Sequence, residues 1–202
     1  MKPGGEPTMN LQSRVVNILT KPNAEWPVIA NEPTGVASLY KEYIVYLAAI
    51  PPVCAFIGMT VIGISLPFFG TYRSSLASGI SSLIVHYVLS LVGVFAAAFI
   101  VDKLAPTFQS GGGIVQALKM VAYASTPSWV AGVLAILPAL SLLSILAGLY
   151  GIYLFYLGLP HVMRTPPEKV VPYMVVAAVV IIVIYIVIGS VSSMMSGIPR
   201  PV

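Results

Sequence analysis

The stretch that decides the fold lies near the carboxyl end of the chain, where residues 175–188 read VVAAVVIIVIYIVI. This run contains no charged residue, and its side chains are apolar on every side of a helix, so lipid or protein must surround it. Strands of an outer-membrane barrel are a poor alternative, because they alternate apolar and polar residues over about ten positions. The run therefore predicts a helix that spans a membrane.

The composition of the whole chain agrees with a membrane protein. Of the 202 residues, 58% are hydrophobic and 8% are charged, whereas soluble domains have about 45–50% apolar and about 25% charged residues. Such a chain has too few polar groups to cover a soluble surface. Its mean hydropathy of +0.96 also excludes disorder. The single cysteine, Cys54, excludes an internal disulfide and a cysteine-based zinc site.

Further apolar runs set the expected architecture, since a bilayer core of about 30 Å takes about 20 helical residues. We expect an all-α polytopic membrane helical bundle with five transmembrane helices, at residues 43–66, 80–101, 114–137, 139–159 and 173–191. These lie in one domain, residues 43–196, between a cytoplasmic amphipathic arm, residues 1–42, and a tail, residues 197–202. The junction between the third and fourth spans has no polar loop. A tight outer turn at Pro138 is expected there, and a re-entrant third span is the alternative.

The positions of the cations orient the bundle. With five spans and a cytoplasmic amino terminus, the cations on the inside are Lys2, Arg14, Lys21, Lys41, Lys103, Lys119, Arg164 and Lys169. Arg73 and Arg200 then lie outside with the carboxyl terminus, which satisfies the positive-inside rule. A re-entrant third span gives almost as good a count, so charge fixes the side of the amino terminus rather than the number of crossings. Because the net charge of +4 is spread over the rims without a dense cluster, we expect membrane lipids and no nucleic acid as partners.

The arm contains an amphipathic pattern. Its apolar residues recur at helical spacing and are Leu11, Val15, Ile18 and Leu19. This pattern predicts an interfacial helix on the inner membrane surface, with a helix packed on the bundle as the alternative. Residues 20–27 are expected to turn the chain, and Trp26 is expected to anchor in the headgroup layer.

Prolines are expected to break two spans. Pro51 and Pro52 interrupt the first span, and Pro127 interrupts the third beside three hydroxyl groups. These hydroxyls, from Ser125, Thr126 and Ser128, would form a polar notch at mid-membrane. A binding cavity at broken helices is typical of transporters, and fixed bends that serve packing are the alternative.

Two ionisable residues lie within the expected spans. Intramembrane ionisable groups are candidates for function, so His86 joins the candidate polar site. No carboxylate lies in any expected span to orient it, and a neutral histidine bonded to a serine is the alternative. Lys119 lies near the cytoplasmic end of the third span, and its long stem predicts an interfacial anchor, as we also expect for Arg164.

Enzyme motifs are missing from the sequence. It contains no H-E-x-x-H and no G-x-S-x-G. No cluster offers three protein ligands to a metal. We therefore expect no catalytic residue, no metal and no cofactor.

Several segments together resemble a known family. They are YASTP at 123–127, LYGIYLFYLGLP at 149–160 and MRTPPEK at 163–169, with ILTKP at 18–22 followed by Glu25 and Trp26. Over about residues 10–195 the chain resembles the bacterial branch of the YIP-one (Ypt-interacting protein) domain family. The resemblance implies five spans, a cytoplasmic amino terminus and a bacterial inner membrane. For the eukaryotic relatives it also implies Rab-type GTPase partners and work in membrane traffic through homo- and hetero-oligomers. Because the arm here is short and lacks their Asp-Leu-Tyr-Gly-Pro-type stretch, no GTPase partner is expected.

The matched segments also carry a structural prediction. Tyr150 and Tyr153 lie within the fourth span, and their hydroxyls need partners that the notch at residues 125–128 could supply. The third and fourth spans should therefore pack together.

We predict a non-enzymatic, oligomeric scaffold that organises the membrane or binds lipids or a membrane-protein partner. The alternatives are a small transporter or channel with a cavity at the broken spans, and an accessory subunit of a larger complex.

Overall fold

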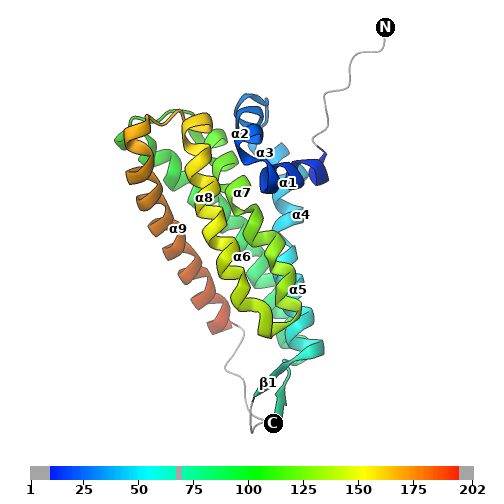
Figure 1. The fold of residues 1–202 in the computed structure, drawn as a ribbon. Helices are drawn as coiled ribbons and strands as arrows, with labels where there is room; N and C mark the ends of the chain where they lie inside the picture. The colour runs from blue at the N-terminus through cyan, green and yellow to red at the C-terminus, as the bar shows by residue number, and fades with distance from the viewer. Residues whose placement is uncertain (1–9, 67–69, 196–202) are drawn as a thin grey trace.

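The structure, a computed structural model, describes residues 10–66 and 70–195 (Figure 1). In that part the chain is a helical bundle with one short hairpin. The arm contains two helices, α1 (Leu11–Thr20) and α2 (Pro22–Asn31), and its expected last residues, 36–42, belong to the helical segment that follows. A first long helical segment comprises α3 (Val36–Leu39), η1 (Tyr40–Ile44), α4 (Val45–Ala48), α5 (Ile50–Ile57) and η2 (Gly58–Ile62). The remaining helices are α6 (Leu76–Leu104), η3 (Ala105–Phe108), α7 (Gly113–Ala131), η4 (Gly132–Ile136), η5 (Pro138–Leu143), α8 (Ser144–Val162) and α9 (Pro167–Met195). The expected tail lies outside the described residues.

Four helical segments are long and apolar enough to cross a membrane. They are Val36–Ile62, Leu76–Phe108, Ser144–Val162 and Pro167–Val191. The prediction of an all-α bundle with several membrane-spanning helices is confirmed. The expected third span corresponds to α7 and η4, and α7 is not among these four. Because α7 packs against α6, α8 and the arm, it can carry polar side chains that a lipid-facing helix could not.

The first span differs from the prediction at its end. Its interruption lies at Ala49, and Pro51 and Pro52 occupy the first turn of α5, where a missing N–H costs least. The helix ends at Gly63, whose φ is +82°. Residues 64–66, which were expected to be helical, instead form strand β1 (Ile64–Leu66). It pairs antiparallel with β2 (Gly70–Tyr72), in the register that places Ile64 opposite Tyr72.

The arm packs on the bundle. Asn10 caps α1 by accepting hydrogen bonds from the N–H groups of Gln12 and Ser13. α1 contacts α2 and α7, so its apolar face covers protein, which is the alternative considered above. Within the stretch expected to turn the chain, residues 20–27, Lys21 separates α1 from α2, and residues 22–27 form the first part of α2. Pro22 stands in its first turn, where proline is well tolerated, and Pro27 lies inside the helix.

α7 and α8 lie side by side, as predicted for the third and fourth spans. They approach closely at Gly151, where an added Cβ would stand 2.7 Å from the backbone oxygen of Ala124. Pro127 does not break α7, which continues to Ala131. The expected break is therefore wrong, because a proline removes one backbone hydrogen bond and the packed neighbours hold the helix on both sides of it.

The two ends of the bundle differ in charge. The arm, the α6–α7 connection and the α8–α9 turn lie together at the end that we call the arm end, and the hairpin and the α7–α8 turn lie at the other (Figure 1). Among the described residues, Arg73 is the one Lys or Arg near the hairpin, and the other cations lie toward the arm end.

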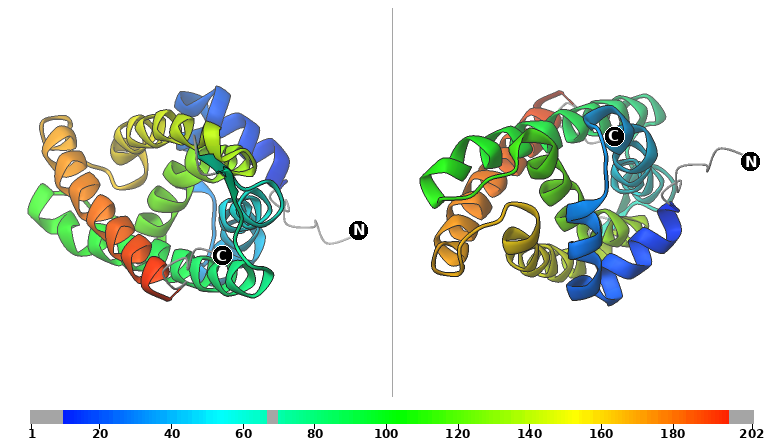
Figure 2. Two further views of the ribbon diagram at one scale, coloured as in Figure 1. Left: turned by 90° about the horizontal axis from the view of Figure 1, so that it is seen from below. Right: turned by 90° about the horizontal axis from the view of Figure 1, so that it is seen from above.

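α9 packs on α6 at the side of the bundle away from α1 (Figure 2). There Tyr173 donates a hydrogen bond to the Val101 oxygen.

Candidate functional site

A cavity of about 480 Å³ lies between α5, α6, α7, α8 and α9, and we call it the central cavity. It brings together five residues of the predicted site and breaks, namely Pro51, Pro52, His86, Ser125 and Ser128. Most of its remaining wall is apolar and includes Trp129, Phe155 and Ile181. The central cavity therefore suits an apolar occupant that needs few hydrogen bonds.

A second cavity of about 420 Å³ lies toward the hairpin, and we call it the hairpin-end cavity. It shares four lining residues with the central cavity, which are Pro51, Pro52, His86 and Ser128. Its own wall adds further hydroxyls, from Ser74, Ser78, Ser82 and Ser144. His86 thus stands where an apolar cavity meets a more polar one.

The other predicted polar residues lie elsewhere. Thr126 is fully buried and shares a 2.7 Å hydrogen bond with the Tyr43 hydroxyl. Tyr150 donates to the Leu19 backbone oxygen at 2.8 Å, and the Tyr153 side chain is 46% exposed. The expected hydrogen bonds between these two tyrosines and the notch are therefore absent. Sequence reasoning missed Tyr43, because nothing local links it to a partner 83 positions away.

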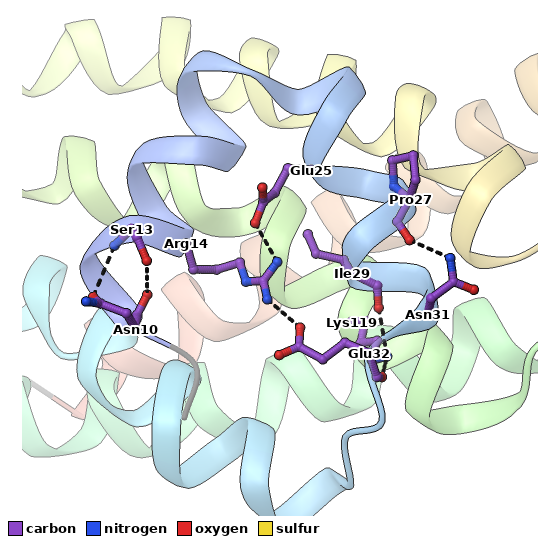
Figure 3. A network of polar contacts seen from close by, with 9 residues as sticks. All are labelled: Asn10, Ser13, Arg14, Glu25, Pro27, Ile29, Asn31, Glu32 and Lys119. Carbon is purple, nitrogen blue, oxygen red and sulfur yellow. Dashed lines mark hydrogen bonds and ion pairs between the residues drawn. The ribbon is translucent and has the colours of Figure 1, made fainter. Parts of the chain in front are cut away.

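An ion cluster holds the arm on the bundle (Figure 3). The Arg14 guanidinium donates to Glu25 through one nitrogen and to Glu32 through another. Arg14 and Glu25 are each 8% exposed. The guanidinium also lies 5.8 Å from the centre of the Tyr123 ring on α7. This cluster was not predicted, because the helical pattern placed Arg14 on the polar face without indicating what that face would meet.

Lys119 is not the interfacial anchor that the sequence suggested. Its side chain is buried, and its Nζ donates to the Ile29 oxygen at 2.8 Å and to the Glu32 oxygen at 2.6 Å (Figure 3). These carbonyls lie at the carboxyl end of α2, where backbone oxygens lack helical donors and a cation is favoured. Lys119 therefore joins α7 to the arm.

Trp26 is also buried instead of facing headgroups. Its ring is fully covered and meets Tyr123 edge to face, with 6.4 Å between ring centres. Gly158 makes room for it, since a Cβ there would lie 2.8 Å from the indole ring. Arg164, in contrast, is exposed in the turn between α8 and α9, where an anchoring role stays a prediction.

Within residues 10–66 and 70–195, no three His, Cys, Asp or Glu side chains come together as a metal site would require. Long apolar helices that enclose a mainly apolar cavity, with an arm packed at one end, define a polytopic integral membrane protein.

Comparison with known proteins gives the family. Residues 16–189 match the Yip1 domain, so the chain belongs to the Yip1 domain family and the resemblance found in the sequence is confirmed. The chain is similar to "Inner membrane protein YohC" of Escherichia coli (strain K12), with 26% identity over 123 residues. The same figures hold for YohC of Escherichia coli O6:H1 (strain CFT073). The match spans 61% of this chain and 63% of that relative, which is less than two thirds of its length. No solved structure matches.

Proposed function

We propose that this chain is a non-enzymatic, five-span scaffold of a bacterial inner membrane that holds a lipid acyl chain in its central cavity. The observation that carries the proposal is the central cavity itself, which is walled mainly by apolar side chains of the long helices. The name of the YohC relative supports the inner membrane as the location.

The distribution of charge supports the orientation. Seven of the eight described cations lie toward the arm end, and the positive-inside rule places that end in the cytoplasm. α7 starts beside the arm and leads into a turn near the hairpin, which supports a crossing helix instead of a re-entrant one (Figure 1). Five crossings then place the carboxyl end of α9 outside.

The nature of the cavity favours an acyl chain. The solvent around the spans is hydrocarbon, and a space of about 480 Å³ falls in the range of about 300–1,000 Å³ typical of small-molecule sites. The polar groups on its wall are few, and Ser125 and His86 are among them. A polar solute would lose its hydrogen bonds to water in this cavity and gain too few in return. An acyl chain has no hydrogen bonds to lose.

A cavity-filling substitution tests the proposal. Gly148 lines the central cavity and has open space where a Cβ would stand, so Gly148→Phe should fill the cavity without a backbone clash. Gly189 on α9 has the same open space and does not line the cavity, which makes Gly189→Phe the matched control. Vesicles of phosphatidylglycerol that carries a diazirine on one acyl chain would be irradiated with each protein.

We expect adducts on cavity-lining peptides of the wild type and of Gly189→Phe, with severalfold fewer for Gly148→Phe. Equal labelling of all three proteins, or labelling restricted to the outer face of α9, would contradict the acyl-chain site.

A second candidate function, transport, is favoured by one observation. The central and hairpin-end cavities share Pro51, Pro52, His86 and Ser128, so a path between them could open if this wall moved. Solute flux into protein-containing liposomes that His86→Phe abolishes would favour transport over the scaffold.

We also propose that the scaffold is a homo-oligomer. α9 presents an exposed apolar face that includes Val179, Ile182 and Ile186. Disulfide crosslinking of Val179→Cys in a Cys54→Ala background should give homodimers in native membranes. Crosslinks to a different membrane protein instead would favour the accessory-subunit alternative. Rab-type GTPases form no part of the proposal.

A further inference from the structure

A third cavity, of about 360 Å³, lies at the arm end, and we call it the arm-end pocket. It is formed by the second half of α2, the start of α7, the end of α8 and the turn that follows. Its side-chain lining is mainly polar and includes Asn31, Gln116, His161 and Arg164. It therefore differs in chemistry from the central cavity, which is mainly apolar.

The charge of the arm-end pocket is basic. No Asp or Glu lines it, whereas Arg164 and His161 do. Two other basic residues of the arm end, Arg14 and Lys119, donate their hydrogen bonds to groups inside the protein. Within the described part of the chain, Arg164 makes no such hydrogen bond or ion pair, so its planar set of donors is available to an anion.

The turn that carries Arg164 is fixed in place. Arg164 has a φ of +53°, a left-handed conformation that a neighbouring structure must hold. Backbone hydrogen bonds of its two neighbours fix this conformation. The Gly111 N–H donates to the Met163 oxygen at 2.8 Å, and the Thr165 N–H donates to the Leu159 oxygen at 3.2 Å. The backbone of Arg164 is therefore prearranged beside the start of α7.

Two further features suit an anion. The Gln116 amide is weakly held, because its Nε2 lies 3.5 Å from the Ala30 oxygen and its Oε1 is buried with no hydrogen-bond partner among the described residues. Its N–H₂ group can therefore turn toward a ligand. The N-cap residue of α7, Gly112, also lines the pocket, and no side chain caps the first N–H groups of this helix.

We propose that the arm-end pocket binds a phosphate group, with Arg164 as the main donor and His161 as the second. The phosphate belongs either to an anionic lipid headgroup or to a free phosphate compound, since both present the same oxygens. A lipid bound there would belong to the cytoplasmic leaflet, which rests on the orientation proposed above. Binding itself does not depend on the central cavity, so either proposal can fail without the other.

Retention of defined lipids tests this pocket in the purified full chain. The protein in a neutral detergent would be mixed with phosphatidylglycerol or phosphatidylcholine, and the bound lipid would be counted by native mass spectrometry. Arg164→Asn removes the guanidinium and keeps a residue that tolerates the left-handed backbone. It would be combined with His161→Gln. Lys169→Gln is the matched control, because this cation lies near the same turn but does not line the pocket.

We expect the double variant to retain at least about tenfold less phosphatidylglycerol than the wild type and Lys169→Gln, because Arg–phosphate contacts are strong and bidentate. Millimolar inorganic phosphate distinguishes the sources. Selective retention of phosphatidylglycerol that phosphate does not displace identifies a lipid headgroup. Displacement by phosphate, with a raised unfolding temperature in the wild type alone, identifies a free phosphate compound.

Equal retention of both lipids together with no effect of phosphate would overturn the proposal, as would equal losses in the double variant and in Lys169→Gln. If the double variant fails to fold, Arg164→Lys decides the question. It keeps a charge but not the bidentate fork, so it should fold and retain severalfold less phosphatidylglycerol. Unchanged retention in Arg164→Lys and in a His161→Gln single variant would then reject the site.

Discussion

Removal of the Arg14 guanidinium should release the arm from the bundle. In an Arg14→Met variant, the carboxylates of Glu25 and Glu32 keep their positions and lose their partner. Breaking a buried ion pair from one side costs about 3–5 kcal/mol. We expect the lower end of that range, because the Glu32 side chain is 21% exposed and water can take over part of the role of Arg14.

A cost of about 3 kcal/mol corresponds to a roughly hundredfold lower ratio of docked to undocked arm. Native-state hydrogen exchange reads this ratio directly, because the amides of α2 exchange when the arm opens. We therefore expect protection in Pro22–Asn31 to fall by about two orders of magnitude in Arg14→Met. Lys21→Met is the control, since Lys21 is exposed and forms no ion pair within the described chain.

A triple variant separates lost attraction from uncompensated charge. Arg14→Met with Glu25→Met and Glu32→Gln removes the whole cluster, and such replacements are often neutral or stabilising. Its α2 protection should therefore recover most of the loss. The reasoning is refuted if Arg14→Met leaves protection within about threefold of the wild type, a difference below about 0.7 kcal/mol. Equal protection in the single and triple variants would refute it as well.

Three further predictions test the packing around α7. Gly151→Val should lower the free energy of unfolding by about 1–3 kcal/mol, because its side chain meets the Ala124 backbone, while Gly148→Val enters open space and should change little; thermal unfolding in detergent measures both. Tyr43→Phe should cost about 0.5–1.5 kcal/mol in the same assay, since its hydrogen bond to a buried threonine is lost. Lys119→Met should weaken arm docking by about 1–3 kcal/mol, seen as faster exchange in α2, because two carbonyls at the end of that helix lose their donor.

The long lipid-facing helices were predictable because each carries its signal in its own composition. α9 is apolar around its circumference, and many of its side chains are exposed on the surface, as expected where lipid is the solvent. The expected second and fifth spans lie inside α6 and α9, whose true ends reach several residues farther. Charged ends and loops are weak markers of helix termini, so those boundaries shifted while the existence of the helices did not.

The contacts that pin the arm could not be predicted, because their partners are distant in sequence. Arg14 meets carboxylates 11 and 18 positions away, and Lys119 meets carbonyls about 90 positions away. A lone cation or tryptophan near a span looks the same in sequence whether it meets a headgroup or another helix. For this reason Trp26 and Lys119 were assigned to the membrane surface.

Two predictions that rest on proline residues differ from the structure. The sequence predicts a turn at Pro22, which instead starts α2, and a break at Pro127, where α7 continues. A proline removes one backbone donor, and the packing of the rest of the helix decides whether the helix continues.

The candidate site was predicted in part, since the central cavity gathers His86, Ser125 and Ser128 but not Thr126 or the tyrosines.

The enclosed position of α7 has a consequence for biogenesis. A segment that carries Gln116 and Lys119 gains little from entering lipid by itself, and a translocon would partition it poorly as a single helix. Both side chains reach the arm: the Gln116 amide nitrogen lies 3.5 Å from the Ala30 oxygen, and the Lys119 ammonium donates to the Ile29 and Glu32 oxygens. In the five-span arrangement proposed above, the arm is synthesised before α7 and is therefore already present to cover these polar groups when that helix enters the bilayer.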